Sequence, residues 1–174
     1  RWIAMECAEL QCVLPHGLLA VSIAATFQPE MARAVRSKDR DAFVHHVTLG
    51  ARTIAMLTLP AAAGLFALRD PLVGLMRRGQ FTTLASQNTA RALAGLAIGL
   101  AAFSVYLFVL RGFYAHHDTR TPFVLNVGEN MLNIVLAFVL VRRWGVLGLG
   151  LSFAIAYIAA AAWALQVMTY KVRG

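Results

Sequence analysis

Hydrophobic residues in this chain come in long runs that are separated by short polar segments. An α-helix needs about 20 apolar residues to cross a bilayer, and five runs come close to that length. No segment alternates apolar and polar residues between turn signals, as the strands of a half-buried sheet do. The pattern predicts an all-α, polytopic membrane protein with about five transmembrane helices, at residues 8–29, 43–68, 88–114, 121–141 and 145–170.

The polar segments between these runs predict short connections. Residues 30–42 are basic, and we expect a surface loop there that is partly helical. Residues 69–83 contain a proline and two glycines, which is typical of an interfacial or re-entrant loop. In the segment HHDTRTP (116–122), we expect Thr121 to cap the next helix and Pro122 to lie in its first turn.

Composition supports a membrane protein. Of 174 residues, 59% are hydrophobic and 14% are charged, and the mean hydropathy is +0.65. A soluble domain is closer to half apolar and a quarter charged. The formal net charge of +8 comes mostly from clusters between the apolar runs, as at a bilayer surface. Because no basic face with interleaved aromatic residues is present, we predict no nucleic-acid partner. The chain begins with Arg1, which suggests a fragment of a longer protein.

The numbers of Lys and Arg on the two sides of the membrane favour one orientation of the chain only weakly. With five helices, the loop at 30–42, the segment 111–120 and the C-terminus share one side, which carries eight Lys and Arg residues. The other side carries seven, and Arg52 is the sixteenth. Cytoplasmic loops are enriched in Lys and Arg. The dense charge at 30–42 therefore favours this loop as cytoplasmic.

Arg52 interrupts the second apolar run. An ionisable residue at the centre of a transmembrane helix costs about 2.5–3.5 kcal/mol, so it is a functional candidate by default. The 16 residues from Thr53 to Leu68 span about 24 Å, against a bilayer core of about 30 Å. If Leu68 marks the far surface, Arg52 lies about one turn inside the near one. The side chain then either extends to the surface or faces a ligand in the protein interior.

A polar stripe follows the fourth run. At 3.6 residues per turn, its members share one helical face, and they are Asn126, Glu129, Asn130 and Asn133. Glu129 lies near the middle of the run, where its short side chain cannot reach water. Such a stripe either hydrogen-bonds across a packed helix interface or lines a water-filled cavity that binds a cation, a proton or a polar headgroup.

Catalytic motifs are lacking in the sequence. It has no phosphate-binding loop, no metal-ligand spacing and no nucleophile beside a base. The histidine pairs at 45–46 and 116–117 lie at predicted helix ends without a Ser or Cys partner. We therefore predict that the chain is not an enzyme and holds no metal site or organic cofactor.

Several stretches together resemble the MurJ (MviN) family of lipid II flippases, in the superfamily of multidrug and polysaccharide exporters. Two of them, RRGQFT (77–82) and GFYAHHDTRTP (112–122), are fairly specific in combination. The others follow in the same order along the chain: LPHGLLAVSIAATFQPEMARA (14–34), GARTIAMLTLPAAAGLFAL (50–68), LNIVLAFVLV (132–141) and GVLGLGLSFAIA (145–156).

The resemblance implies a two-lobed protein of fourteen helices around a central cavity, of which this chain covers about the eighth to twelfth. It implies movement of lipid II, the undecaprenyl-pyrophosphate-linked peptidoglycan precursor, across the bacterial cytoplasmic membrane by alternating access. The partners implied are lipid II, membrane lipids and the remaining helices of the same protein. Arg52 matches a cavity arginine that could meet the pyrophosphate. Some members place a cation site partly on the helix matching 121–141, which makes Glu129, Asn130 and Asn133 candidates for coupling to Na⁺ or H⁺.

Two alternatives stay open at this stage. The first is an exporter of another lipid-linked glycan, or a cation-coupled drug exporter. The second is a membrane scaffold that packs helices without transporting anything. Arg52 and Glu129 should tolerate substitution in a scaffold, whereas a transporter should need them.

Overall fold

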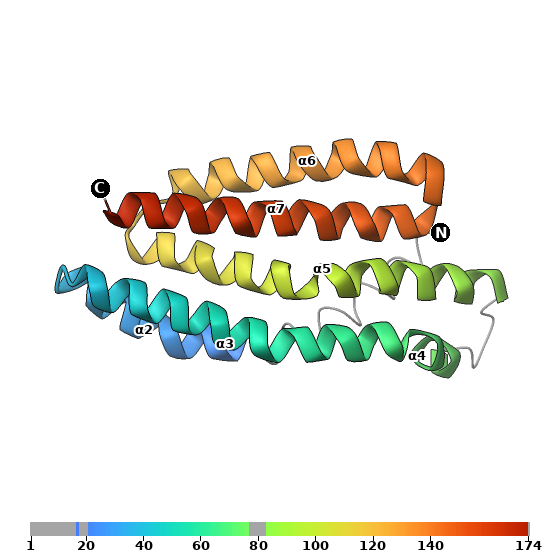
Figure 1. The fold of residues 1–174 in the computed structure, drawn as a ribbon, viewed down its shortest axis with the longest axis horizontal. Helices are drawn as coiled ribbons and strands as arrows, with labels where there is room; N and C mark the ends of the chain where they lie inside the picture. The colour runs from blue at the N-terminus through green and yellow to red at the C-terminus, as the bar shows by residue number, and fades with distance from the viewer. Residues whose placement is uncertain (1–16, 18–20, 77–82, 174) are drawn as a thin grey trace.

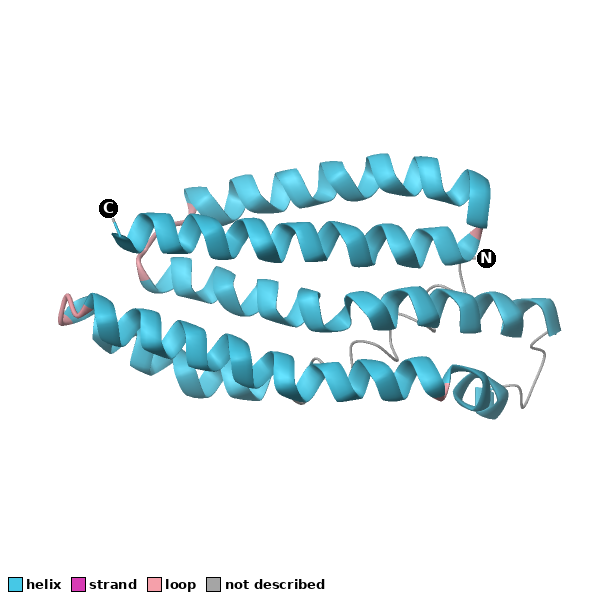
Figure 2. Cartoon of the chain, in the orientation of Figure 1, coloured by secondary structure: helices cyan, strands magenta, loops and turns pink. Residues whose placement is uncertain are grey.

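The computed structural model describes residue 17, residues 21–76 and residues 83–173. Figures 1 and 2 show helices joined by short turns, with no strand in this part of the chain. The helices are α2 (Val21–Arg36), α3 (Arg40–Ala67), α4 (Arg69–Met76), α5 (Thr83–Ala115), α6 (Arg120–Trp144) and α7 (Val146–Arg173).

The long helices form a bundle with α5 and α7 in the middle. In Figure 1, α2 and α3 lie on one side of this pair and α6 lies on the other. α3 packs on α2 and α5, while α6 packs mainly on α7. The apolar residues of α5 surround the whole helix, which is typical of a helix buried by its neighbours. α6 contributes few buried residues, so most of its surface is free for lipid or for other parts of the protein.

Small residues let the two central helices touch through their backbones. A Cβ atom added to Gly95 of α5 would lie 2.7 Å from the Cα of Gly150 on α7. One turn further along, a Cβ on Gly99 would lie 2.8 Å from the Cα of Ala154. Because lipid tails are as apolar as leucine, close van der Waals packing of this kind drives helix association in a membrane.

Four helices in the described part of the chain are long and apolar enough to cross a membrane: Arg40–Ala67, Gln87–Ala115, Arg120–Trp144 and Val146–Lys171. They correspond to the second to fifth predicted spans. The first predicted span, 8–29, lies mostly outside the described residues, and α2 covers its end from Val21.

The basic loop predicted at 30–42 is wrong in extent, because α2 continues to Arg36 and α3 begins at Arg40. The reason is packing. Met31 and Ala34 are buried in the main apolar cluster, and the charged residues of this stretch are exposed or half-buried. Only residues 37–39 are non-helical.

Two tight turns of the same kind lie at this end of the bundle. After α2, the N–H of Asp39 donates to the carbonyl of Ala34 at 3.0 Å, and Lys38 has a φ of 57°. After α5, the N–H of Asp118 donates to the carbonyl of Phe113 at 3.1 Å, and His117 also has a φ of 57°. This is the Schellman arrangement, in which glycine normally takes the left-handed position.

Asp118, not Thr121, caps the N-terminus of α6. Its Oδ1 accepts from the backbone N–H groups of Arg120 and Thr121, both at 3.1 Å. The prediction for Thr121 was therefore wrong: the helix begins at Arg120, its N-cap position is Thr119, and the capping side chain comes from the residue before that. Pro122 lies in the first turn, as predicted.

The predicted loop at 69–83 contains a short helix. Residues 69–76 form α4, which Figure 1 shows running across the end of α3, and residues 77–82 lie outside the described part. At eight residues, α4 is too short to span a bilayer.

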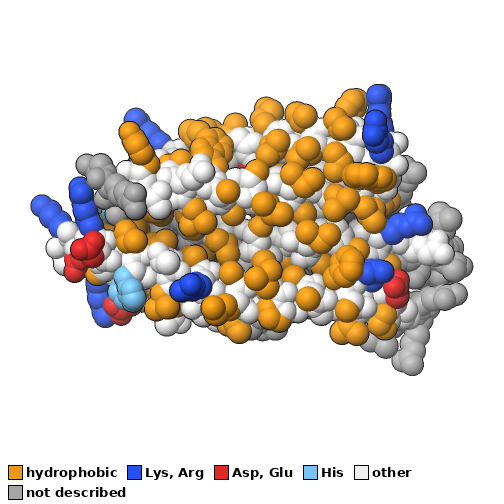
Figure 3. All heavy atoms as spheres, viewed as in Figure 1, with side chains coloured by type: hydrophobic (Ala, Val, Ile, Leu, Met, Phe, Trp, Pro, Cys, Tyr) orange, Lys and Arg blue, Asp and Glu red, His pale blue; other side chains and the backbone are white. Residues whose placement is uncertain are grey.

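Charge is concentrated at the two ends of the bundle (Figure 3). The α2–α3 turn, the α5–α6 turn and the C-terminus of α7 share one end, as the sequence predicted (Figure 1). Between the two ends, the face shown in Figure 3 is largely apolar, as expected of a surface within a membrane. The cytoplasmic orientation of the shared end stays a prediction.

Candidate functional site

Arg52 lies on the outward face of α3. The residues that α3 buries against its neighbours include Gly50 and Ile54, and Arg52 is two positions from each. Two residues correspond to about 200° of helical rotation, so Arg52 is opposite to the buried face. Its side chain is exposed and makes no hydrogen bond or ion pair with the described part of the chain.

Arg52 is also close to the middle of its helix. It follows Arg40 by about 18 Å and precedes Ala67 by about 22 Å, at 1.5 Å per residue. If α3 is centred on a bilayer core of about 30 Å, Arg52 lies about 12 Å below the nearer surface. That depth exceeds the one turn inferred with Leu68 at the far surface, because a centred helix of 28 residues extends about 5 Å beyond each surface.

The polar stripe of α6 is divided between two environments. Glu129 is only 3% exposed, and its Oε1 has no hydrogen-bond partner among the described residues. Asn126 is half-buried and accepts a hydrogen bond from the hydroxyl of Tyr106 on α5 at 2.8 Å. Asn130 is exposed and donates to the carbonyl of Asn126 at 2.8 Å. Asn133 is half-buried. Helix-to-helix bonding thus accounts for Asn126 but not for Glu129.

The structure does not bring Arg52 and the stripe together. α3 and α6 lie on opposite sides of the central α5–α7 pair (Figure 1). Glu129 faces the interior of this bundle, while Arg52 faces away from it.

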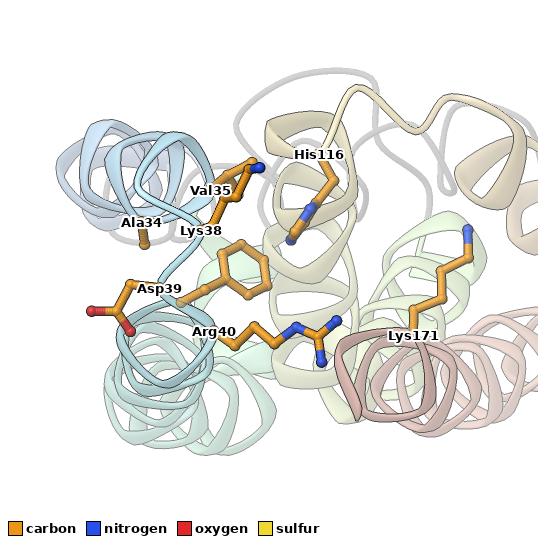
Figure 4. A pocket seen from close by; sticks show the side chains of 8 residues that line it. Ala34, Val35, Lys38, Asp39, Arg40, His116 and Lys171 are labelled. Carbon is orange, nitrogen blue, oxygen red and sulfur yellow. The ribbon is translucent and has the colours of Figure 1, made fainter. Parts of the chain in front are cut away.

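A basic cavity, which sequence reasoning missed, lies at the shared end of the bundle (Figure 4). It has a volume of about 380 Å³ and is lined by Ala34, Val35, Lys38, Asp39, Arg40, Phe43, His116 and Lys171. These residues come from four helix ends that are far apart in the sequence. The sequence placed the clusters of charge at 36–40 and 116–120 on the same side of the membrane, but nothing there showed that they line one cavity.

His116 lines both this cavity and a second one of about 360 Å³, as Lys171 also does. Its imidazole packs edge-on against Phe43, with ring centroids 4.4 Å apart. Burial lowers the pKa of His116 below its ordinary value, and the nearby Lys171 acts in the same direction while Asp118 opposes it.

A network of polar side chains lies beside the second cavity, which Asp118 and Lys171 line. Lys171 of α7 donates to Asp118 Oδ2 and, at 2.7 Å, to Thr121 Oγ1. Thr121 Oγ1 in turn donates to Asp118 Oδ2 at 2.6 Å. These donors hold the pKa of Asp118 well below its ordinary value, with the hydrogen bond from Lys171 as the largest cause. The network ties the start of α6 to the end of α7.

Replacing Asp118 with asparagine is expected to destabilise the full-length protein by about 1–2 kcal/mol at neutral pH, since it weakens a helix cap and removes an ion pair. A carboxyl with a lowered pKa stabilises the fold above its unfolded pKa and loses that effect as the pH falls. As the pH decreases below about 4, the melting temperature of the wild type should therefore fall, and the variant should lack this part of the fall. Thermal unfolding in detergent at several pH values measures both melting temperatures. Asp70→Asn is the control, since Asp70 is exposed, and equal pH profiles for wild type and Asp118→Asn would contradict the assignment.

No group of three His, Cys, Asp or Glu side chains that could hold a metal ion occurs among the described residues. The histidines at 116 and 117 belong to the turn and the cavity described above. The sites that remain are the outward arginine, the buried glutamate and the basic cavity.

Comparison with known proteins connects this fold to a family of flippases. The family model described as lipid II flippase MurJ matches residues 3–174. The lipid II flippase MurJ of Thermosipho africanus is 28% identical over 163 residues, which cover 92% of this chain and 33% of the relative. The probable lipid II flippase MurJ of Rhizobium meliloti is 34% identical over 128 residues, 73% of this chain and 24% of the relative.

The fold agrees as well. A solved structure described as lipid II flippase MurJ in an inward closed conformation superposes with a TM-score of 0.84 at 26% sequence identity, over 95% of this chain and 35% of that one. The chain thus spans about a third of the length of the relatives it matches. The resemblance inferred from the sequence motifs is confirmed: this helical membrane chain belongs to the lipid II flippase MurJ family.

Proposed function

We propose that the full-length protein containing this chain moves lipid II across the bacterial cytoplasmic membrane for cell-wall synthesis. The observation that carries this proposal is the family match over residues 3–174, together with a fold that superposes on a lipid II flippase at a TM-score of 0.84. The chain contributes part of such a transporter, since it spans about a third of its relatives.

Arg52 is our candidate for the substrate contact. A guanidinium group binds a pyrophosphate through bidentate, charge-assisted hydrogen bonds. Arg52 is exposed on the outward face of α3 and engages no other group in the described part of the chain, so all its donors are available. Far below the membrane surface, an arginine is tolerated when it faces a water-filled cavity. The outward face of α3 would therefore line the cavity between this part and the rest of the protein.

Transport assays with the full-length protein test the substrate. In proteoliposomes, we expect fluorescent lipid II to become accessible to an external quencher or enzyme faster than in protein-free vesicles. Another undecaprenyl-linked glycan and a cationic drug should not be moved. Transport of either of these in preference to lipid II would replace the proposal with one of the exporter alternatives.

Glu129 is our candidate for coupling transport to a cation. A hard cation takes several oxygen ligands. Near Glu129, Asn126 already accepts from Tyr106, and the amide nitrogen of Asn130 is used on its own helix. Oε1 of Glu129 is the buried side-chain acceptor without a partner among the described residues. A single buried carboxylate oxygen suits a proton better than Na⁺, so we propose H⁺ as the coupling ion.

Glu129→Gln tests this role because it keeps the shape of the side chain and removes its ability to ionise. In proteoliposomes, we expect wild-type flipping to rise several-fold with an imposed proton gradient and the variant to lose that response. Met131→Ala is the control, since Met131 is an exposed apolar residue on the same helix. A variant that responds to the gradient like wild type would exclude Glu129 from coupling, and a response to Na⁺ alone would point to the other ion.

A further inference from the structure

The basic cavity at the shared end of the bundle has unpaired positive charge. Lys38 and Arg40 line it, and neither makes an ion pair with the described part of the chain. The acidic residue that lines it, Asp39, accepts a hydrogen bond from the N–H of Ala42 at 2.9 Å, and Figure 4 shows its carboxylate turned away from the cavity. The charge of Lys171 is shared with Asp118. Lys38 and Arg40 are thus left to bind an anion.

The three polar side chains that face one another come from separate elements. Lys38 from the turn after α2, Arg40 at the start of α3 and His116 after α5 line the same cavity, and Figure 4 shows Arg40 and His116 extending into the space between α3 and α5. Phe43 is buried and gives this space an apolar floor. A group with an anionic head and an apolar tail would satisfy both the cationic rim and this floor.

The backbone at Lys38 supports a role for its side chain. Its φ of 57° is the left-handed conformation, which glycine adopts without strain and lysine does not. A lysine at this position gives up backbone stability relative to glycine, and it places an ammonium group at the rim of the cavity. Strained residues of this kind tend to cluster at ligand sites.

We propose that this cavity binds the phosphodiester headgroup of an anionic membrane lipid through Lys38, Arg40 and His116. The cavity is lined by residues at the ends of the helices, and the ends of transmembrane helices meet the membrane surface, where lipid phosphates lie. Arg40 precedes Arg52 by 12 residues, about 18 Å along α3, so this site is separate from the proposed substrate contact. The inference does not depend on which substrate the protein transports.

Thermal unfolding of the full-length protein in a neutral detergent measures binding. Short-chain phosphatidylglycerol should raise the melting temperature in a saturable way, and short-chain phosphatidylcholine, whose phosphate is neutralised by choline, should raise it much less. The Lys38→Gln/Arg40→Gln double variant should raise the apparent Kd for phosphatidylglycerol by roughly 10- to 30-fold. The matched control is Arg142→Gln/Arg143→Gln, which removes two charges at the other end of the bundle and should leave that Kd unchanged.

Lys38→Gly separates binding from folding. It removes the ammonium group and relieves the strained turn, so this variant should melt no lower than wild type without lipid and still bind phosphatidylglycerol more weakly. Equal losses in both double variants would overturn the site in favour of general attraction to charged lipid. Inorganic phosphate that gives the same saturable shift would overturn the lipid assignment and identify a site for a free anion.

Discussion

Arg52→Ala in the full-length protein should reduce lipid II flipping by at least about 100-fold while membrane insertion and yield stay near wild type. The physical reason is that two charge-assisted hydrogen bonds to a pyrophosphate are worth about 3 kcal/mol or more, and a neutral side chain cannot replace them. The fold should survive, because Arg52 is exposed and bonded to nothing else in the described part of the chain. Proteoliposome flipping and growth of cells that depend on the variant measure the effect.

Two further variants sharpen this experiment. Arg52→Lys keeps the charge but loses the bidentate geometry, so it should retain only partial activity. Met56→Ala is a matched control, since Met56 is an exposed residue one turn further along α3 and carries no charge. If Arg52→Ala flips lipid II at the wild-type rate, Arg52 is only a residue that extends to the membrane surface.

Much of the fold follows from the sequence, because bilayer thickness sets the length of an apolar helix. α5, α6 and α7 coincide with predicted runs, and each extends past its run by a few residues. The boundary between α2 and α3 was harder to predict. Polar residues around 33–40 resemble a loop in composition, whereas the burial of Met31 and Ala34, which continues the helix, depends on contacts with other helices.

The candidate site was less accessible to sequence reasoning. In a membrane chain, both faces of a helix are apolar, so the pattern of α3 could not show which face Gly50 and Ile54 bury or that Arg52 opposes it. The link between Lys171 and Asp118 joins residues 53 positions apart, and no local pattern encodes such a contact. Glu129 stood out in the sequence because a carboxylate is unusual within a transmembrane helix. Its burial depends on neighbouring helices and was not predictable from its own helix alone.

The contact between Gly95 and Gly150 is expected to be a sensitive part of the packing between α5 and α7. In Gly95→Val, the Cβ atom would lie 2.7 Å from backbone atoms of α7, so no rotamer change can relieve the clash and the two central helices must separate. Overpacking costs about 1–3 kcal/mol when side chains can adjust, and a backbone clash should reach or exceed the upper end. We expect most of the full-length variant to be lost as aggregate in size-exclusion chromatography, with a lower melting temperature in the remainder.

Gly64→Val distinguishes this packing effect from a change in helix propensity. Gly64 lies within α3, and a Cβ atom there would have no neighbour within 4 Å, so valine changes the helix propensity without a clash. This control should behave like wild type, and Gly95→Ala should fall between the two valine variants because it adds only the clashing Cβ. If Gly95→Val and Gly64→Val gave the same yield and melting temperature, the backbone contact would not hold α5 and α7 together. An intermediate Gly95→Ala would instead show that the distance between the two backbones limits stability, so that even one added methyl group at this contact pushes α5 and α7 apart.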